Sequence, residues 1–306
     1  VRIVYQVYCH RNFSESRYHF ALRKDLLKDL GKFAGVSTFS GVLQVVTAEG
    51  LVLVINLTFG AALNAVYVIA LQLKNSIQSF AMNIFKAISP QITKTYASGE
   101  IEHHKALVYT GSKMAVYMLY LIFFPFLFQT DYIMHLWLGK VPPYTVEFAQ
   151  VMAFVSLTYA AFEPIRSAVL ATNRITKFML VPDSLSLLGL PIAYFLAKNG
   201  GNPSVFVYVI LAMEVSACVL RVFYGAQVSV IKVREVFRSI VIPICLVGGV
   251  QVAIWRLFLS SFSPTILHLI FTILLNALTT IFAVFAFGLS QSEKAALWRE
   301  GRKLKL

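Results

Sequence analysis

Residues Ile266 to Gly288 read ILHLIFTILLNALTTIFAVFAFG, a run that contains no Asp, Glu, Lys or Arg. A helix needs about 20 mostly apolar residues to cross the ~30 Å hydrocarbon layer of a membrane, and this run has that length. Seven other blocks resemble it, and 58% of the 306 residues are hydrophobic while 13% are charged. The sequence therefore predicts an all-α polytopic membrane bundle of eight transmembrane helices, at about 33 to 55, 64 to 85, 107 to 128, 146 to 170, 179 to 197, 204 to 224, 239 to 259 and 266 to 288.

The positive charge is distributed in a pattern that predicts topology. Segments 9 to 32, 86 to 106, 171 to 178, 225 to 238 and 289 to 306 carry 19 Lys or Arg, whereas the alternate connections carry only Lys140 and Lys198. Basic connections stay on the cytoplasmic side of a membrane, so these segments and the C-terminus are expected there. Because the basic residues lie in scattered loops, the net charge of +13 does not indicate nucleic acid as a partner.

The chain opens Val-Arg-Ile-Val, without an initiator Met or a signal peptide, and we expect it to begin inside a helix of a longer protein. Residues 1 to 8 would end that helix, and residues 9 to 32 would form a basic cytoplasmic linker. Within the linker, Glu15 to Phe33 predicts either a helix on the membrane surface or a solvated connection. Residues 225 to 288 would add a cytoplasmic loop and a further helix pair, and 289 to 306 a basic tail.

The block from 64 to 85 has a polar face through most of the bilayer. At 100° per residue its polar side chains fall within an arc of about 140°. They are Asn64, Gln72, Asn75, Gln78, Ser79 and Asn83. Lipid cannot satisfy such a face, which indicates polar helix packing or, as we favour, a cavity that forms a transport path.

Charged residues inside the blocks add to this expectation. Lys74 lies at the edge of the polar arc, and its candidate charge partners are Glu49, Asp183 and Glu214. A charge in a membrane needs a partner or water, so Lys74 belongs either to a structural ion pair or to the transport path. Glu163 and Arg166 are spaced to pair on one helix face and favour a structural role.

The motifs of common enzymes and cofactor sites are not found in the sequence. It has no HExxH, Walker loop, dinucleotide fingerprint, GxSxG or paired-cysteine metal spacing, and we expect no enzyme activity, cofactor or metal. Cys9, Cys218 and Cys245 are expected to be packing residues, and His103 and His104 ordinary loop histidines. Energy for transport would come from an ion gradient or from consumption of the product.

Three stretches carry a resemblance to a known family. They are Asn56-Leu-Thr-Phe59-Gly60, Asn64-Ala65-Val-Tyr67-Val-Ile69-Ala70-Leu-Gln72 and Pro90-Gln91-Ile92-Thr-Lys94-Thr-Tyr96-Ala97-Ser-Gly99-Glu100. Together they resemble polysaccharide biosynthesis membrane proteins, the O-antigen flippase branch of the multidrug, oligosaccharidyl-lipid and polysaccharide (MATE-like) exporter superfamily.

The resemblance implies two six-helix lobes, of which residues 33 to 224 would be the second. Alternating access between the lobes would carry an undecaprenyl-pyrophosphate-linked oligosaccharide across the bacterial inner membrane, for biosynthesis of O-antigen, which is part of lipopolysaccharide, or of capsular polysaccharide or exopolysaccharide. Its partners would be that lipid-linked oligosaccharide, membrane lipids and other polysaccharide-assembly proteins.

Two other functions stay open at this point. A cation-coupled multidrug efflux transporter of the same superfamily would also have a membrane cavity. A membrane-embedded O-antigen polymerase or ligase would normally present a large outer loop, but the longest outer connection, about Gln129 to Thr145, is short.

Overall fold

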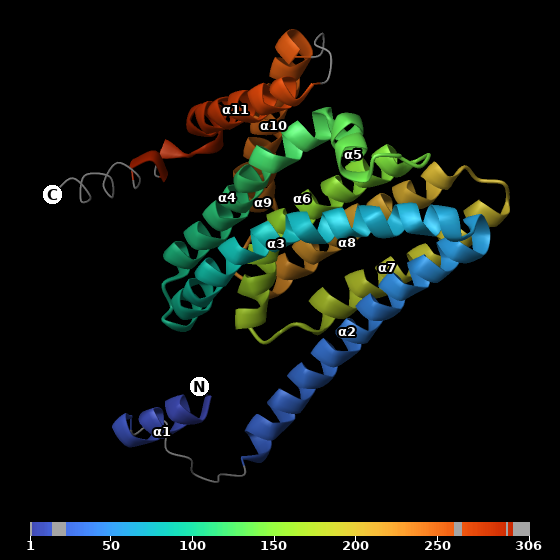
Figure 1. Ribbon diagram of the computed structural model, residues 1–306. Coiled ribbons are helices and arrows are strands. Elements are labelled where there is room, and N and C mark those ends of the chain that lie inside the picture. The colour runs from blue at the N-terminus through green and yellow to red at the C-terminus, as the bar shows by residue number, and fades with distance from the viewer. Residues whose placement is uncertain (1, 14–22, 260–264, 292, 296–306) are drawn as a thin grey trace.

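The computed structural model describes residues 2–13, 23–259, 265–291 and 293–295. Every regular element in these ranges is a helix (Figure 1). The long elements are α2 (Lys24–Phe59), α3 (Ala61–Ala97), α4 (Ile101–Phe128), α6 (Thr145–Ala171), α7 (Thr176–Lys198), α8 (Pro203–Val228), α10 (Ile242–Ile254) and α11 (Ile266–Ala283). The shorter ones are α1 (Arg2–Asn12), α5 (Thr130–Leu138) and α9 (Val233–Val236), with π-helical turns η2 (Phe237–Val241), η3 (Trp255–Leu259) and η4 (Val284–Gly288).

Within the described residues, seven helices are long and apolar enough to cross a membrane. They are Lys24–Phe59, Ile101–Phe128, Thr145–Ala171, Thr176–Lys198, Pro203–Val228, Val233–Phe258 and Ile266–Gly288. The expected all-α bundle with several spans is thus seen, and the chain has the features of a multi-pass membrane protein. The count of eight is not confirmed, because α3, which contains the expected 64 to 85 block, is not among the seven.

Each long helix packs against particular neighbours in the bundle. The α3 helix packs against α6 and α4, while α2 packs against α7 and α7 against α8. The pair α10 and α11 lies beside α4, on the side of the bundle away from α2 and α7 (Figure 1). A core of α2, α3, α4, α6, α7 and α8 therefore carries one attached helix pair.

Polar side chains join that pair to the core inside the apolar layer. Gln129 Nε2 donates to Thr272 Oγ1 at 2.7 Å, and Asn276 Nδ2 donates to the Tyr120 carbonyl oxygen at 3.1 Å. Within the pair, Thr279 Oγ1 of α11 donates to Gln251 Oε1 of α10 at 2.9 Å. Such bonds hold membrane helices together where apolar contact gives little preference for a partner over lipid.

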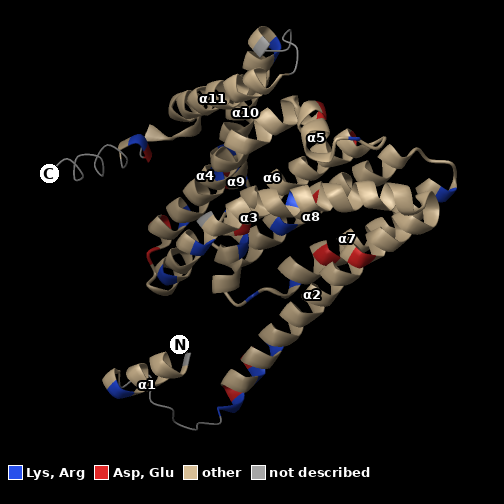
Figure 2. Cartoon of the chain, in the orientation of Figure 1, with Lys and Arg blue, Asp and Glu red and all other residues tan. Residues whose placement is uncertain are grey.

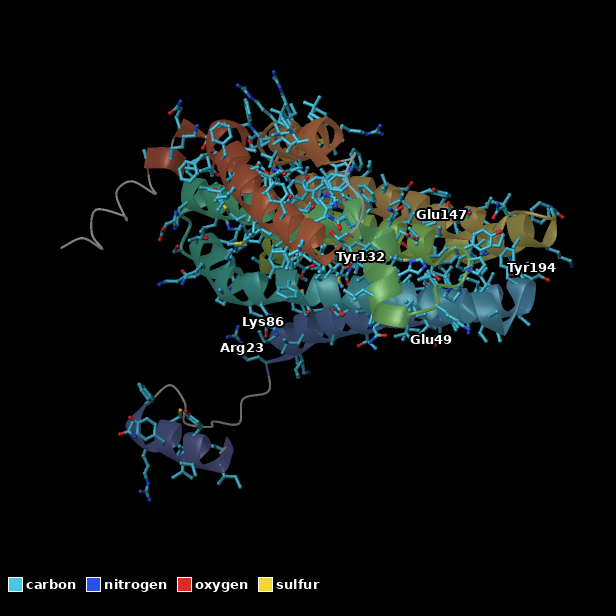
Figure 3. The ribbon with its side chains drawn as sticks, turned by 45° about the horizontal axis from the view of Figure 1, so that its top comes forward. Arg23, Glu49, Lys86, Tyr132, Glu147 and Tyr194 are labelled. Atoms are coloured by element: carbon cyan, nitrogen blue, oxygen red, sulfur yellow. The ribbon has the colours of Figure 1, made fainter. Side chains whose placement is uncertain are left out.

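The basic connections lie at one end of the bundle. Phe33 near the start of α2 and Val228 at the end of α8 both pack against a buried cluster that includes Ile175 at the start of α7. Another cluster brings together Ile92, near the end of α3, and Val108, near the start of α4. Figure 2 shows Lys and Arg at the start of α2 and around the α3–α4 turn, and few at the opposite α2–α3 and α7–α8 turns. In Figure 3, Arg23 and Lys86 lie toward the basic end, and Glu147 and Tyr194 toward the other.

Several helices extend beyond their expected blocks. The first helix reaches Asn12 instead of ending at residue 8, so Cys9 is helical, and α2 begins at Lys24 instead of residue 33. A membrane-surface helix from Glu15 to Phe33 falls partly outside the described residues; its part from Lys24 onward is the first turns of α2. The α3 helix continues to Ala97, because lysine is a good helix former and Lys86 and Lys94 can continue the helix outside the apolar layer. Only residues 98–100 then form the turn before α4.

Candidate functional site

A cavity of about 420 Å³ lies between α2, α3, α6, α7 and α8. Six charged side chains line it: Lys74, Glu163, Arg166, Asp183, Glu214 and Arg221. Asp183 comes seven residues after the start of α7, and Arg221 seven residues before the end of α8. At 1.5 Å per residue, both lie about 10 Å inside the basic end of the bundle. The cavity thus places charges within membrane-length apolar helices.

Asp183 is the most enclosed charged group in the cavity, with 3% of its surface exposed. Its Oδ2 accepts hydrogen bonds from Ser40 Oγ and from Gln44 Nε2, both on α2. Its Oδ1 accepts from Arg221 Nη2 of α8 at 3.1 Å. A buried carboxylate requires such donors because desolvation alone would disfavour its charge. Asp183 therefore ties α7 to two neighbouring helices.

Arg221 bridges two carboxylates. Besides Asp183, it contacts Glu214 of its own helix, with 3.3 Å between Nη1 and Glu214 Oε1. Two residues seven apart lie two turns apart on one helix face, which brings Glu214 beneath the guanidinium. The planar guanidinium carries five N–H donors and so can serve both carboxylates.

Glu163 and Arg166 form the ion pair that their spacing on α6 predicts. Arg166 Nη1 lies 2.7 Å from Glu163 Oε1. The side chain of Glu163 is 7% exposed and that of Arg166 is 42% exposed. Arg166 thus neutralises a buried carboxylate while remaining open to water on its other side.

Lys74 enters the cavity from α3, opposite α8. Within the described part of the chain, no salt bridge within 4.0 Å involves its ammonium group. It is near enough to Glu214 for an electrostatic interaction. Among the cavity's cations described here, Arg166 and Arg221 are paired and Lys74 is not. Lys74 is thus the cavity cation whose charge has no carboxylate within 4.0 Å in the described part of the chain.

The other candidate partner, Glu49, is exposed and is not among the residues that line the cavity. The face of α2 turned to the cavity carries Gln44, Thr47 and Ala48, and Glu49 follows Ala48 by about 100° around the helix. Of the three candidates, Asp183 and Glu214 share the cavity with Lys74.

The structure divides the predicted polar arc of α3 between two faces. Gln78 lines the cavity beside Lys74. Gln72, Asn75, Ser79 and Asn83 are exposed, and Asn64 is half-buried with an Oδ1 atom that has no hydrogen-bond partner. The exposed four form an outer polar face on α3, which the cavity does not include.

Arg221, which contacts two of the predicted partner carboxylates, was not singled out by the sequence analysis. It stands near the end of its apolar block, where a basic residue usually marks the membrane boundary. The available signal was its spacing of seven residues from Glu214, which places both side chains on one face. The contact to Asp183 joins different helices, and no single-helix pattern predicts it.

The prediction that His103 and His104 lie in a loop is wrong, because both are in the first turn of α4. His104 is buried, with Nδ1 2.9 Å from the Ile92 carbonyl oxygen and with Nε2 lacking a hydrogen-bond partner among the described residues. Cys218 is buried, Cys9 is half-buried and Cys245 is exposed, and no disulfide joins them in the described part of the chain. Among the described residues, no group of three or more His, Cys, Asp or Glu side chains could hold a metal ion.

Comparisons with protein-family models, curated proteins and solved structures found no match to this chain. The cavity itself is thus the basis for a functional proposal.

Proposed function

We propose that this chain is part of a membrane transporter that flips an undecaprenyl-pyrophosphate-linked oligosaccharide across the bacterial inner membrane. The observation that carries the proposal is the charged cavity inside apolar helices, with Lys74 as its unpaired cation. A charge placed in a membrane bundle is expensive, so an unpaired one usually belongs to a substrate or ion path. A Lys ammonium is a compact point charge suited to phosphate.

The orientation follows from the distribution of charge. The basic end of the bundle would face the cytoplasm under the positive-inside rule. The cavity extends from Leu51 and Tyr67, toward the opposite end, to Arg166 and Arg221, toward the basic end, and Lys74 lies between them. The outer polar face of α3 is available to a second helical lobe or to the sugar chain.

A cation-coupled multidrug efflux transporter is the second candidate. It is favoured by the three carboxylates of the cavity, Glu163, Asp183 and Glu214, which would attract a cationic drug or a coupling ion. Each of them contacts an Arg, but Asp183 and Glu214 share Arg221, so Lys74 is the cation that balances the remaining negative charge. Among the described residues, Lys74 is the cavity cation without a carboxylate within 4.0 Å, and this favours an anionic substrate. A membrane-embedded polymerase or ligase has no comparable support from the cavity.

The test is restoration of surface polysaccharide in a flippase-deficient strain by the complete protein. Lys74→Ala should reduce surface polysaccharide at least about tenfold, at unchanged abundance in the membrane, if ~1.4 kcal/mol of substrate attraction is lost. Lys86→Ala is the matched control, because Lys86 lies on the same helix, exposed and outside the cavity.

Drug susceptibility of the same strains separates the two candidates. Flippase function predicts unchanged susceptibility to cationic drugs with and without the protein. Increased drug resistance together with unrestored polysaccharide would reject the flippase and support efflux.

A further inference from the structure

We propose that Arg221 is a positioning residue that keeps Lys74 free by holding Glu214 and Asp183. This inference deepens the proposed function, on which the role of Lys74 as an anion contact depends. It concerns the pairing of charges inside the cavity, which can be measured whether or not the chain transports anything.

The charges around α8 are two carboxylates and two cations, which differ in their contacts. Asp183 and Glu214 are both in contact with Arg221, and Lys74 lies across the cavity within electrostatic range of Glu214. Two carboxylates and two cations share this region, but the guanidinium alone contacts both acids. Lys74 is left over because Arg221 can serve two partners at once, which an ammonium on a single stem does less well.

The two carboxylates differ in how they depend on Arg221. Asp183 also accepts hydrogen bonds from Ser40 and Gln44 on Oδ2, so one of its two oxygens keeps its donors without the guanidinium. In the described part of the chain, the hydrogen-bond donor to Glu214 other than Arg221 is the Cys218 thiol, with 3.8 Å between Sγ and Oε1. If Arg221 were absent, Glu214 would be the less satisfied acid and would also be the one near Lys74.

Loss of Arg221 should therefore cause Glu214 to capture the Lys74 ammonium. The flexible side chain of Lys can move to a new partner, and an unpaired carboxylate in this desolvated setting gains by accepting it. Lys74 would then be present but no longer available. Arg221 would affect an anionic substrate through Lys74, without needing to touch it.

Accessibility of the Lys74 amine gives a direct test. Membranes containing the complete protein are treated with a small membrane-permeant amine-acylating reagent, and acylation of Lys74 is followed by mass spectrometry per molecule of protein. Arg221→Met should slow acylation about tenfold, which corresponds to ~1.4 kcal/mol of new ion pairing. Arg174→Met, at an exposed Arg in the α6–α7 turn, should leave it unchanged.

Two double variants with equal net charge make the test specific. Arg221→Met with Glu214→Gln should restore fast acylation, because the capturing acid is gone. Arg221→Met with Asp183→Asn should stay slow, because Glu214 remains. Arg221→Lys, a milder change, should slow acylation partially, because its single ammonium cannot hold both carboxylates as the guanidinium does.

Unchanged acylation in Arg221→Met, or equal acylation in the two doubles, would overturn the positioning role. Export measurements on the same variants report separately on the proposed function. Slow acylation in Arg221→Met, combined with normal export in Lys74→Ala, would keep the positioning role and reject the substrate role of Lys74. Loss of export in Lys74→Ala, with acylation indifferent to Arg221, would do the reverse.

Discussion

Lys74 and Asp183 illustrate two ways in which a charge is accommodated inside this bundle. Asp183 is enclosed, and both of its oxygens accept hydrogen bonds from α2 or α8, whereas Lys74 lines the cavity without a carboxylate within 4.0 Å among the described residues. Both were evident in the sequence as charges inside apolar blocks. Their partners were not, because pairing depends on how helices distant in sequence are rotated toward one another. Glu49 is exposed and does not line the cavity, although it is near enough to the lining residue Tyr67 for an electrostatic interaction.

At this scale we predict that Lys74 couples energetically to Glu214 and not to Glu49. In double-mutant cycles, Lys74→Met with Glu214→Gln should deviate from additivity by about 0.5 kcal/mol or more in thermal stability of the detergent-solubilised protein. Lys74→Met with Glu49→Gln should be additive within about 0.3–0.5 kcal/mol. A larger coupling to Glu49 would show that the ion pair lies outside the cavity and would restore the structural explanation for Lys74.

Among the elements, the segment after η4 is held against α4 by an ion pair between Glu293 and Lys113. Lys113 Nζ lies 2.6 Å from Glu293 Oε2, and the Lys113 side chain is 4% exposed. Thr110 Oγ1 and the Ser290 backbone N–H also donate to Glu293. From the sequence, residues 289 to 306 were expected to form a basic tail, and no role was predicted for Lys113. Thr110, Lys113 and Tyr117 share one face of α4, which is the pattern that could have indicated a docking site.

We predict that the ion pair between Lys113 and Glu293 is lost in acid. Burial raises the pKa of Glu293, but hydrogen bonds from Lys113, Thr110 and Ser290 outweigh it and lower the pKa below its usual value. A carboxylate with a lowered folded pKa stabilises the fold above its unfolded pKa, about 4.3 for Glu, and this stabilisation is lost as pH falls through the folded pKa. Thermal stability in detergent should therefore decrease below about pH 4, and Glu293→Gln should weaken that decrease.

The same pair gives a second prediction at neutral pH. Glu293→Gln should destabilise the protein by roughly 1–3 kcal/mol, because it leaves Lys113 buried without its counter-charge. Adding Lys113→Met should recover most of that loss. Glu102→Gln, which removes an exposed partner of Lys105, should change stability by less than about 1 kcal/mol. Failure of the double variant to recover would mean that Glu293 acts independently of Lys113.

For the whole molecule, the sequence predicted the helical class and most of the spans because an apolar block of membrane length allows few other structures. The exception is α3, whose polar residues both lower its hydropathy and produce the features that make it a candidate for function. Basic and neutral connections alternate along the chain, and in the structure the two kinds lie at opposite ends of the bundle. The side of the membrane on which each end lies remains a prediction.

Reporter fusions test that prediction. Truncations fused after Ser98, in the α3–α4 turn, should be active with a cytoplasmic reporter, and those after Tyr144, before α6, with a periplasmic one. The physical reason is that basic residues resist translocation. The same location for both fusions would contradict the topology, and with it the orientation of the cavity.

The outer polar face of α3 leads to a prediction about the chain by itself. Gln72, Asn75, Ser79 and Asn83 would meet lipid in an isolated bundle, where their amides and hydroxyls lack partners. The 306-residue chain expressed alone should therefore fail to restore surface polysaccharide in the deficient strain. Full restoration would show that the face needs no covering lobe.

The size of the cavity has a consequence for the range of substrates. At about 420 Å³ it is near the lower end of the ~300–1,000 Å³ typical of small-molecule pockets. It can admit a pyrophosphate group with water, but a chain of several sugars would have to remain outside. If the transporter recognises only the group that all such lipid carriers share, glycans of different composition should be exported at similar rates. Selection among them would then fall to the enzymes that build the chains.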